Sequence, residues 1–396
     1  MKISGIVCEY NPMHNGHVHH IRKTRENGAT HILCVMSGNF VQRGETALMD
    51  KFSRAETAVS CGADLVIEIP TVYCLSSAEF YARGAVSIMH SLGCVDEISF
   101  GSECGDIETL KKAAEAILML STSDIETKLR SGLSYPSAVS AVLCEKYGNE
   151  LAEIAASPNN ILAIEYLKTL SFLNSDISPF TVKRIAAEHD SSTTDNGFAS
   201  ASHIRKMLLE SERIYEFVPQ SVYEKICENR KNDRLSGMEN LERIVLYRLR
   251  TMSAEQLLKI PDVGQGLEYR LKQYDNSGSI RELLENVKTR RYTMARLRRI
   301  LMNMIIGVTA EDLKNLPPYA KILAMNERGR EILARCKNST IPISTSLSKL
   351  SEMGENASRF AQLEAVASDI FGLSQNNTGS RNDDFRAKVR IIKNED

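Results

Sequence analysis

Hydrophobic residues in the first two hundred positions fall into short continuous runs, separated by longer stretches with helical spacing. The runs have the length of strands buried on both faces; they begin at Ile3 and continue at residues 30–36, 64–70, 95–101 and 180–185. Between them, apolar residues three and four positions apart predict helices near residues 17–28, 50–62, 78–92, 106–120 and 158–171. Strands that alternate with helices in this way predict an α/β fold with a doubly wound parallel sheet.

The pattern changes in the second half of the chain. From about residue 206 the strand pattern ends, and amphipathic helical patterns continue to about residue 370. We therefore expect an all-helical carboxyl-terminal region after the sheet, with an α/β domain over residues 1–205, a helical domain over 206–373 and a tail over 374–396. The tail is polar and rich in asparagine, which predicts flexibility at least from Gln375 to Asp384.

A histidine-rich turn follows the first predicted strand, since four of the chain's eight histidines lie between His14 and His20. Asn11-Pro12 ends the strand, and residues from His17 onward have helical spacing. This order places His14, Gly16 and His17 at a helix start, where free backbone N–H groups and the positive end of the helix dipole attract phosphate. Gly16 permits close approach of the backbone, and the imidazoles are suited to donate hydrogen bonds to phosphate oxygens.

This His-x-Gly-His pattern resembles the signature of the nucleotidyltransferase superfamily, which also contains the class I aminoacyl-tRNA synthetases. Two other interpretations of the histidines stay open. One is that they are satisfied side chains at a helix start; the other is a metal site built from His14, His17, His19 and His20. No Cys-x-x-Cys pair accompanies them to complete a usual zinc set. We expect a nucleotide site here and no metal site made by the protein.

Polar loops follow the predicted strands, and parallel sheets bind their ligands at these ends. The candidate substrate-binding residues in these loops are Ser37, Asn39, Arg43, Gly101, Asn159, Asn160, Ser202 and Arg205. Taken singly, each also fits a structural role as a helix cap, a turn former or a solvated loop residue. Four such loops in one sheet favour a shared binding site.

Charge and cysteine content narrow the class of protein. The chain of 396 residues carries 49 basic and 50 acidic side chains, so any basic surface must be local. Nine cysteines without a Cys-x-x-Cys pair favour reduced thiols in a cytoplasmic protein. No apolar run reaches 18 residues, and no basic segment precedes a long apolar one at the amino terminus. We therefore expect neither secretion nor membrane insertion.

Five segments together resemble the bacterial tRNA(Met) cytidine acetate ligases, and the similarity runs across nearly the whole chain. The segments are Glu9–His17, Ser37–Glu45, Phe100–Glu103, Ser134–Pro136 and Pro158–Tyr166, with a weaker mark at Ile260–Leu267. Met13 stands where phenylalanine is common in the family, an exchange that we do not expect to change the chemistry.

The resemblance implies a two-step reaction. Acetate attacks the α-phosphate of ATP to give acetyl adenylate and pyrophosphate, and the wobble cytidine of elongator tRNA(Met) then becomes N4-acetylcytidine. The residues that the resemblance assigns to ATP are Val7, Cys8, Glu9, Tyr10, Asn11, Pro12, Met13, His14, Asn15, Gly16, His17, Val18, His19, His20, Gly101, one or both of Asn159 and Asn160, Arg184 and Ile185. Catalysis is expected from His14, His17 and Arg43, which would align and neutralise the triphosphate.

The other ligands follow from this reaction. Mg²⁺ is expected to arrive with ATP and to need no cage made by the protein. Acetate needs a small pocket, for which Ser37 or Asn39 would supply a hydrogen-bond donor. Ser202 and Arg205 are further candidates for contact with ATP or substrate. No obligate protein partner is expected.

A basic stretch in the helical half is the candidate RNA-binding surface. Its residues are Lys288, Arg290, Arg291, Tyr292, Arg296, Arg298 and Arg299, with no acid among positions 288–299. The basic side chains would contact phosphates, and Tyr292 would stack on an unpaired base. The alternative is a solvated helix face whose apolar side packs into the core. Arg243, Arg248 and Arg250 form a weaker second group.

Two other functions fit parts of the pattern. A small-molecule adenylyltransferase, acting on nicotinate mononucleotide or phosphopantetheine, would share the His-x-Gly-His and Ser-Ala-Ser-x-Ile-Arg elements but would not need the long helical half. A non-catalytic RNA- or nucleotide-binding module would keep the fold without turnover, although both motif histidines are intact. Walker A, Gly-x-Gly-x-x-Gly and Gly-x-Ser-x-Gly motifs are absent from the sequence, which argues against P-loop, dinucleotide and hydrolase sites.

Overall fold

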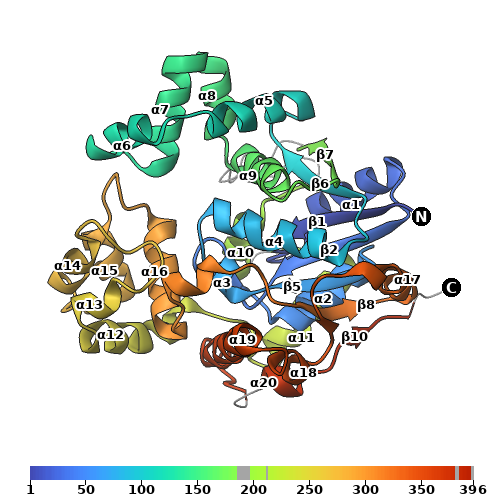
Figure 1. The fold of residues 1–396 in the computed structure, drawn as a ribbon. Helices are drawn as coiled ribbons and strands as arrows, with labels where there is room; N and C mark the ends of the chain where they lie inside the picture. The colour runs from blue at the N-terminus through green and yellow to red at the C-terminus, as the bar shows by residue number, and fades with distance from the viewer. Residues whose placement is uncertain (185–196, 211–212, 380–382, 394–396) are drawn as a thin grey trace.

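A twisted, mostly parallel sheet forms the centre of the protein (Figure 1). The computed structural model describes residues 1–184, 197–210, 213–379 and 383–393. The strand order is β10-β8-β5-β2-β1-β6-β7, with β9 beside β8, and only the pair of β5 and β8 is antiparallel. The strands of this sheet are β1 (Ile3–Cys8), β2 (His31–Ser37), β5 (Leu65–Ile69), β6 (Glu97–Ser102), β7 (Ser178–Lys183), β8 (Ala320–Met325), β9 (Ile343–Ser344) and β10 (Arg390–Ile391). A separate hairpin joins β3 (Phe40–Val41) to β4 (Glu45–Thr46).

Helices surround this sheet and extend beyond it. Up to residue 231 they are α1 (Asn15–Glu26), α2 (Lys51–Ser60), α3 (Thr71–Cys74), α4 (Ala78–Leu92), α5 (Ile107–Leu118), α6 (Thr122–Arg130), α7 (Tyr135–Tyr147), α8 (Asn149–Ala156), α9 (Pro158–Phe172), α10 (Ala201–Leu209) and α11 (Gln220–Lys231). After it they are η1 (Met238–Leu241), α12 (Glu242–Thr251), α13 (Ala254–Leu257), α14 (Leu267–Gln273), α15 (Ile280–Val287), α16 (Met294–Ile306), η2 (Ala310–Lys314), α17 (Glu327–Arg335), η3 (Cys336–Asn338), α18 (Leu347–Ser351), α19 (Glu355–Leu373) and α20 (Asp383–Arg386). Among the described residues, no helix combines the length and the apolar character that crossing a membrane requires.

Alternate residues of the central strands face two different hydrophobic layers. All seven residues of β2 are buried. Leu33 and Val35 belong to the layer that also contains the apolar residues of α4 and α9, whereas Ile32 and Cys34 belong to the layer with α1, α2, α10 and α11. A parallel sheet covered on both faces confirms the predicted doubly wound α/β class. The five strands predicted from the first half of the sequence are β1, β2, β5, β6 and β7.

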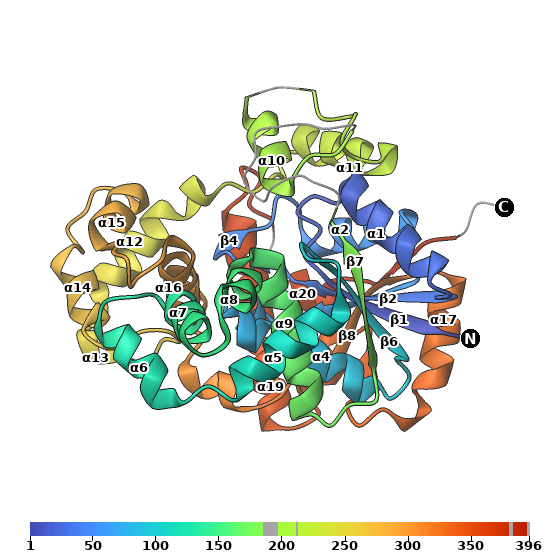
Figure 2. The same cartoon turned by 90° about the horizontal axis from the view of Figure 1, so that it is seen from above.

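The carboxyl-terminal part is not all helical, which corrects the prediction for residues 206–373. Figures 1 and 2 show α12 to α16 as a group of helices to one side of the sheet, while the later chain returns to the sheet. There β8 pairs with β5 in antiparallel register, with Leu65 opposite Met325. Periodicity does not distinguish a strand from a helix in a run of only six residues. Ala320–Met325 forms a strand because it pairs with the open edge of β5.

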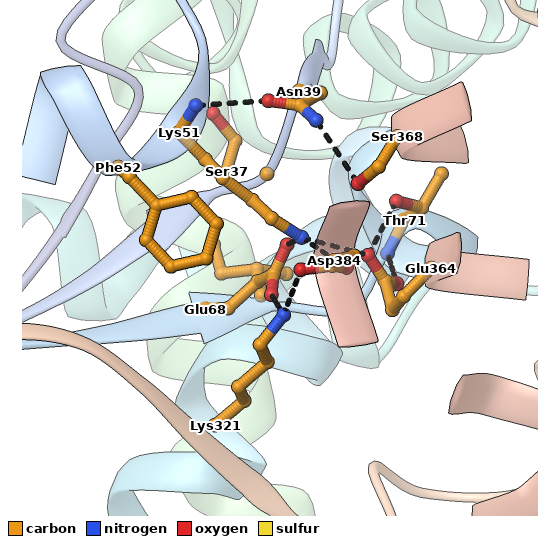
Figure 3. A network of polar contacts seen from close by, with 12 residues as sticks. Ser37, Asn39, Lys51, Phe52, Glu68, Thr71, Lys321, Glu364, Ser368 and Asp384 are labelled. Atoms are coloured by element: carbon orange, nitrogen blue, oxygen red, sulfur yellow. Dashed lines mark hydrogen bonds and ion pairs between the residues drawn. The ribbon is translucent and has the colours of Figure 1, made fainter. Parts of the chain in front are cut away.

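The described part of the tail packs against the protein, contrary to the predicted flexibility from Gln375 to Asp384. Gln375 and Asp384 are both buried, and the Gln375 amide donates to the carbonyl of Arg234 at 2.7 Å. Asp384 accepts from the ammonium groups of Lys51, at 2.7 Å, and Lys321 (Figure 3). Lys51 and Lys321 belong to α2 and β8, which are distant from the tail in the sequence, so the polar composition of the tail did not indicate these ion pairs.

Asp384 belongs to a buried cluster of two lysines and three carboxylates, which also includes Glu68 and Glu364 (Figure 3). Burial and the charge of Glu68 raise the pKa of Glu364 to about 8, although Lys51 opposes the shift. The adjoining lysines hold the pKa of Asp384 at about 2, against the effect of burial. With Glu364 protonated near neutral pH, two positive charges face two negative ones. The three carboxylates lie close enough together to hold a metal ion, but Lys51 and Lys321 already pair with them.

Candidate active site

A cavity of about 280 Å³ opens at the carboxyl ends of β1, β6 and β7. The starts of α1, α9 and α10 and the β3–β4 hairpin complete its walls. Of the residues predicted from the sequence, those that line it are Val7, Cys8, Glu9, Tyr10, Asn11, His14, Gly16, His17, His19, His20, Arg43, Gly101, Asn159, Arg184, Ser202 and Arg205. Folding therefore brings four separate loops to one site, as expected for the strand ends of a parallel sheet.

His14 and His17 form a capping box at the start of α1. Nδ1 of His14 accepts from the backbone N–H of Gly16 at 3.1 Å, and Nδ1 of His17 accepts from the N–H of His14 at 3.2 Å. The two rings are stacked, with centroids 3.7 Å apart. Because both Nδ1 atoms accept, each neutral ring carries its proton on Nε2, the atom that remains to donate to a ligand in the cavity.

Burial keeps these imidazoles neutral. It lowers the pKa of His14 to about 3, and the positive charge of Arg184 adds to the effect. The pKa of His17 is also lowered, by burial first and then by His14 and Arg184. Burial lowers the pKa of His20 to about 4, and its Nε2 pairs with the Ser99 hydroxyl at 2.9 Å. His14, His17 and His20 are therefore neutral near physiological pH.

Gly16 fits the start of α1 for a local reason. A Cβ on this residue would come within 2.9 Å of the His14 ring. Asn15 holds the same turn from outside the cavity, because its amide donates to the carbonyls of Gly197 and Glu216 at 2.9 Å each. Among the remaining predicted ATP residues, Pro12, Met13, Asn15, Val18 and Asn160 do not line the cavity. Ile185 lies outside the described residues.

Arg54 on α2 links the ends of two strands beside the cavity, and it was not among the residues predicted from the sequence. Its side chain is fully buried and donates to the backbone carbonyls of Glu9, Ser37 and Gly38, with Nε bound to the carbonyl of Met49. These carbonyls follow β1 and β2, so one guanidinium sets the relative position of both strand ends. A signal was present, since Arg54 falls at helical spacing among the apolar positions of the predicted helix.

The asparagine pair at the start of α9 has a clear structural role. The Glu103 carboxylate accepts from the backbone N–H groups of Asn159 and Asn160, at 3.0 and 2.8 Å, and from the Asn159 amide at 2.7 Å. In return, Oδ1 of Asn160 accepts from the N–H of Glu103 at 2.9 Å. This exchange joins the loop after β6 to α9. Gly101 lies two residues before Glu103, and a Cβ added to it would be 3.4 Å from Cγ of Arg184.

The β3–β4 hairpin presents Arg43 to the cavity and rests on α16. A Cβ on Gly44 would come within 2.3 Å of the backbone nitrogen of Arg299, so only glycine allows this close approach. Glu45 on the same hairpin pairs with Arg298 of α16 and lies 3.6 Å from Arg205 of α10. The hairpin thus connects the cavity wall to the helical group.

Ser37 and Asn39, the predicted acetate donors, do not line the cavity. Oδ1 of Asn39 accepts from the backbone N–H of Lys51 at 2.8 Å, and its amide donates to the Ser368 hydroxyl at 3.1 Å (Figure 3). Ser37 is fully buried, and its carbonyl accepts from Arg54 at 3.1 Å. Ser37 ends β2 and Asn39 lies two residues beyond it, whereas the cavity lies over β1, β6 and β7.

Known proteins resemble this chain over almost its full length. A family model for HIGH Nucleotidyl Transferase matches residues 1–385. A tRNA(Met) cytidine acetate ligase of Acetivibrio thermocellus is 38% identical over 403 residues, which span 96% of this chain and 97% of that protein. One of Clostridium novyi is 40% identical over 365 residues, spanning 88% and 91%. The chain belongs to the family of tRNA(Met) cytidine acetate ligases.

Solved structures agree with this assignment. The apo structure of Thermotoga maritima TmcAL superposes with a TM-score of 0.93 at 30% identity, over 99% of this chain and 100% of that one. The same protein bound with alpha-thio ATP superposes with a TM-score of 0.90. The predictions of the family and of an ATP-dependent ligase with a nucleotidyltransferase-like fold are confirmed.

The basic stretch of this ligase is less available than predicted. Tyr292 is 7% exposed, and its hydroxyl donates to the carbonyl of Gln265 at 3.2 Å, so it does not present a face to an RNA base. Arg296 donates to the carbonyl of Asp262, and Arg299 is buried with its Nη2 3.4 Å from the Asp262 carboxylate. Two more side chains of the stretch have partners within the protein: Arg291 donates to Gln265, and Arg298 pairs with Glu45. Lys288 and Arg290 are exposed to solvent.

An aromatic and apolar wall on one side of the cavity was missed from the sequence. It consists of Tyr81 on α4, Phe100 on β6, and Leu162 and Tyr166 on α9. The ring centroids of Phe100 and Tyr166 lie 5.6 Å apart. Each residue occupies an ordinary core position in the helical or strand pattern, so periodicity gave no sign that these four side chains meet at a ligand site. The sequence did hold two hints: Phe100, Leu162 and Tyr166 lie in the segments Phe100–Glu103 and Pro158–Tyr166 that resemble the family, and Leu162 and Tyr166 share one face of α9.

Proposed function

We propose that this protein activates acetate with ATP as acetyl adenylate and transfers the acetyl group to N4 of the wobble cytidine of elongator tRNA(Met). The observation that carries the first step is the pair of neutral imidazoles, His14 and His17, at the amino end of α1 in the cavity. The related Thermotoga maritima structure with alpha-thio ATP supports a nucleotide in this fold, and the names of the relatives support the tRNA substrate. The cytoplasm, where tRNA is found, is the proposed compartment.

In the first step, an acetate oxygen attacks the α-phosphorus of ATP, and pyrophosphate leaves with the electrons of the broken P–O bond. Acetate reacts as an anion, so no side chain needs to remove a proton. The protein aligns the reactants and neutralises charge. Nε2 of His14 and His17 would donate to phosphate oxygens, and the guanidinium groups of Arg43, Arg184 and Arg205 line the same cavity.

Mg²⁺ is proposed to enter with ATP and to neutralise further phosphate charge. Among the described residues that line the cavity, Glu9 is the one carboxylate, and its Oε1 already accepts from the N–H of Gln42 at 2.7 Å. A hard cation that keeps several waters fits such a site when the phosphates supply its other ligands.

In the second step, the cytidine amine attacks the acetyl carbon, AMP leaves, and the nitrogen loses one proton. Burial raises the pKa of Glu9, although the hydrogen bond from the Gln42 N–H and the charges of Arg205 and Arg54 oppose the shift. A raised pKa makes this carboxylate a stronger base, so Glu9 is the proposed acceptor of that proton. The wall formed by Tyr81, Phe100, Leu162 and Tyr166 would limit the access of water to the reactive adenylate.

The proposed RNA surface contains fewer residues of the 288–299 stretch than the sequence predicted. Lys288 and Arg290 are exposed at the end of α15, and Arg243, Arg248 and Arg250 are exposed along α12. These side chains lie on the helical group that the β3–β4 hairpin connects to the cavity. We propose that they contact tRNA phosphates, while Arg298 and Arg299 position the hairpin.

A direct assay tests the proposal. Purified protein would be incubated with labelled acetate and ATP, with and without total tRNA, and the products separated by thin-layer chromatography. We expect labelled acetyl adenylate without tRNA and labelled N4-acetylcytidine with it. His17→Ala should lower adenylate formation about 10²–10³-fold, because one donor to the developing charge is lost. His90→Ala, an exposed histidine on α4 outside the cavity, is the control.

Two results would contradict the proposal. If the protein does not consume acetate but releases pyrophosphate with nicotinate mononucleotide or phosphopantetheine, it is a small-molecule adenylyltransferase. If it binds tRNA and ATP without turnover, it is a binding module. The intact histidine pair favours catalysis over the second outcome, and the exposed arginines of the helical group favour tRNA over the first.

A further inference from the structure

Two cysteines lie with their sulfur atoms in contact near the amino end of β6, at the opposite end of that strand from the cavity. Cys94 lies between α4 and β6, and Cys336 begins η3 at the end of α17. Their Sγ atoms are 2.9 Å apart, and the two residues are 5% and 7% exposed. The nine cysteines of the chain are free thiols in this structure. The separation exceeds a disulfide bond, about 2.05 Å, by less than one ångström.

The backbone already holds the two segments together. The N–H of Thr340 donates to the carbonyl of Ser91 at 2.9 Å. An added Cβ on Gly93 would lie 3.3 Å from the carbonyl oxygen of Asn338. Both contacts lie within five residues of a cysteine of the pair. A bond between the sulfurs therefore needs small side-chain rotations and no movement of a helix.

The two sulfurs are not equivalent. A hydrogen bond joins the two sulfurs, and either thiol can donate it. Contact with Cys94 lowers the pKa of Cys336, against the effect of burial. The same hydrogen bond and burial raise the pKa of Cys94. Cys336 is thus the sulfur that more readily becomes a thiolate, the nucleophilic form, and Cys94 stays a thiol beside it.

We propose that Cys94 and Cys336 form a reversible redox-modification site that reacts with a small peroxide. The Cys336 thiolate attacks one oxygen of hydrogen peroxide, the O–O bond breaks, and hydroxide leaves to give a sulfenic acid on Cys336. The Cys94 sulfur then attacks the Cys336 sulfur; the S–O bond breaks, the thiol proton joins the leaving hydroxyl, and water departs. The hydroxide from the first step takes up the proton that Cys336 lost on becoming a thiolate, so overall the two thiols are oxidised and the peroxide is reduced to two waters. A dithiol restores the starting state by thiol–disulfide exchange.

The bond would join parts of the chain 242 residues apart. It would fix the segment from α17 to β9 against the turn before β6. Cys94 precedes β6, whereas Gly101 at the other end of that strand lines the cavity; at about 3.3 Å per residue the two positions lie roughly 20 Å apart. Oxidation is therefore expected to raise the melting temperature and to leave the rate of adenylate formation within about twofold of the reduced protein.

The test uses the full-length protein. It would be treated with hydrogen peroxide, quenched, unfolded, alkylated and digested without reductant for mass spectrometry. We expect one cross-linked peptide pair that contains Cys94 and Cys336, about 2 Da lighter than the two thiol peptides. The titre of denatured thiols should fall from nine to seven and return with dithiothreitol. Oxidation confined to the exposed Cys144 and Cys227, with no such pair, would overturn the proposal.

Single serine variants test the direction of the reaction. In Cys94→Ser the sulfenic acid on Cys336 has no partner and should be trapped by dimedone. In Cys336→Ser the remaining Cys94 should gain no dimedone adduct, because it is the poorer nucleophile. Equal labelling of both variants would refute the assigned roles. The cross-link in the unaltered protein needs no variant to fold, and it does not depend on the acetate and tRNA reaction.

Discussion

Replacing Glu364 by glutamine should change how the stability of this protein depends on pH. The folded protein raises the pKa of this carboxyl from 4.5 to about 8, through burial and the charge of Glu68. Between these values the folded state keeps a proton that the unfolded state has lost, so the free energy of unfolding falls as pH rises. At about 1.4 kcal/mol for each unit, the contribution is roughly 5 kcal/mol; it is complete below about pH 4.5 and lost as pH rises through about 8.

Glutamine keeps the shape of the protonated acid. Thr71 donates to both carboxyl oxygens of Glu364, through its backbone N–H and, at 2.9 Å, through its hydroxyl. A glutamine oxygen accepts the first of these bonds, and its amide group donates to the hydroxyl in place of the second. Glu364→Gln should therefore fold normally near pH 5, where the wild-type side chain is also neutral.

Urea unfolding at pH 5, 6, 7, 8 and 9 measures the effect. The difference in free energy of unfolding, variant minus wild type, should rise with pH at up to about 1.4 kcal/mol per unit and level off above about pH 8. Glu355→Gln, an exposed residue at the start of the same helix, is the matched control and should give a parallel profile. A Glu364→Gln difference that does not vary between pH 5 and 8 would refute the charge assignment of the cluster.

Four further substitutions test the site, its supports and the proposed RNA surface. Gly44→Ala should lower the free energy of unfolding in urea by roughly 1–3 kcal/mol and slow adenylate formation, because the new Cβ meets the backbone of α16. Gly132→Ala is the control, since Gly132 also has a positive φ but has open space around it. Equal losses of stability in the two variants would argue against the contact with α16. Arg54→Met should cost roughly 3–5 kcal/mol, since it leaves several buried carbonyls without a donor; a thermal melt that matches wild type would contradict this. Lys288→Ala and Arg290→Ala should each lower the slope of log K against log salt for tRNA binding by about 1, without changing adenylate formation; an unchanged slope would remove that residue from the RNA surface.

Much of the first half of the fold was predictable because its signals are local. Continuous apolar runs predicted β1, β2, β5, β6 and β7, since a strand buried on both faces has no polar side. The His14–His17 turn was predictable for the same reason: its residues, the break at Asn11-Pro12 and the helix start follow one another within a few positions. The polar loops at the strand ends then converged, as the carboxyl ends of parallel strands must, on one cavity.

The errors share a different origin, namely partners distant in the sequence. Composition predicted a flexible tail, but Asp384 meets Lys51 and Lys321, which lie 333 and 63 residues away. The basic stretch predicted that Arg298 would contact RNA phosphates and that Tyr292 would stack on a base. In the structure, Arg298 pairs with Glu45, and the Tyr292 hydroxyl donates to the carbonyl of Gln265. Whether a basic or aromatic side chain faces solvent depends on which segment lies beside it, and the sequence of one helix does not contain that information.

The sequence by itself determined the α/β class, the histidine-rich start of α1 and the family, because each rests on residues that are neighbours along the chain. Only the tertiary structure decided that β8 would fill the open edge beside β5, that Arg54 would bind the ends of two strands, and that Cys94 would meet Cys336. The physical reason is that an unpaired strand edge, a buried charge or a thiol can be satisfied by many groups. The packing of the whole chain determines which of these groups becomes the partner.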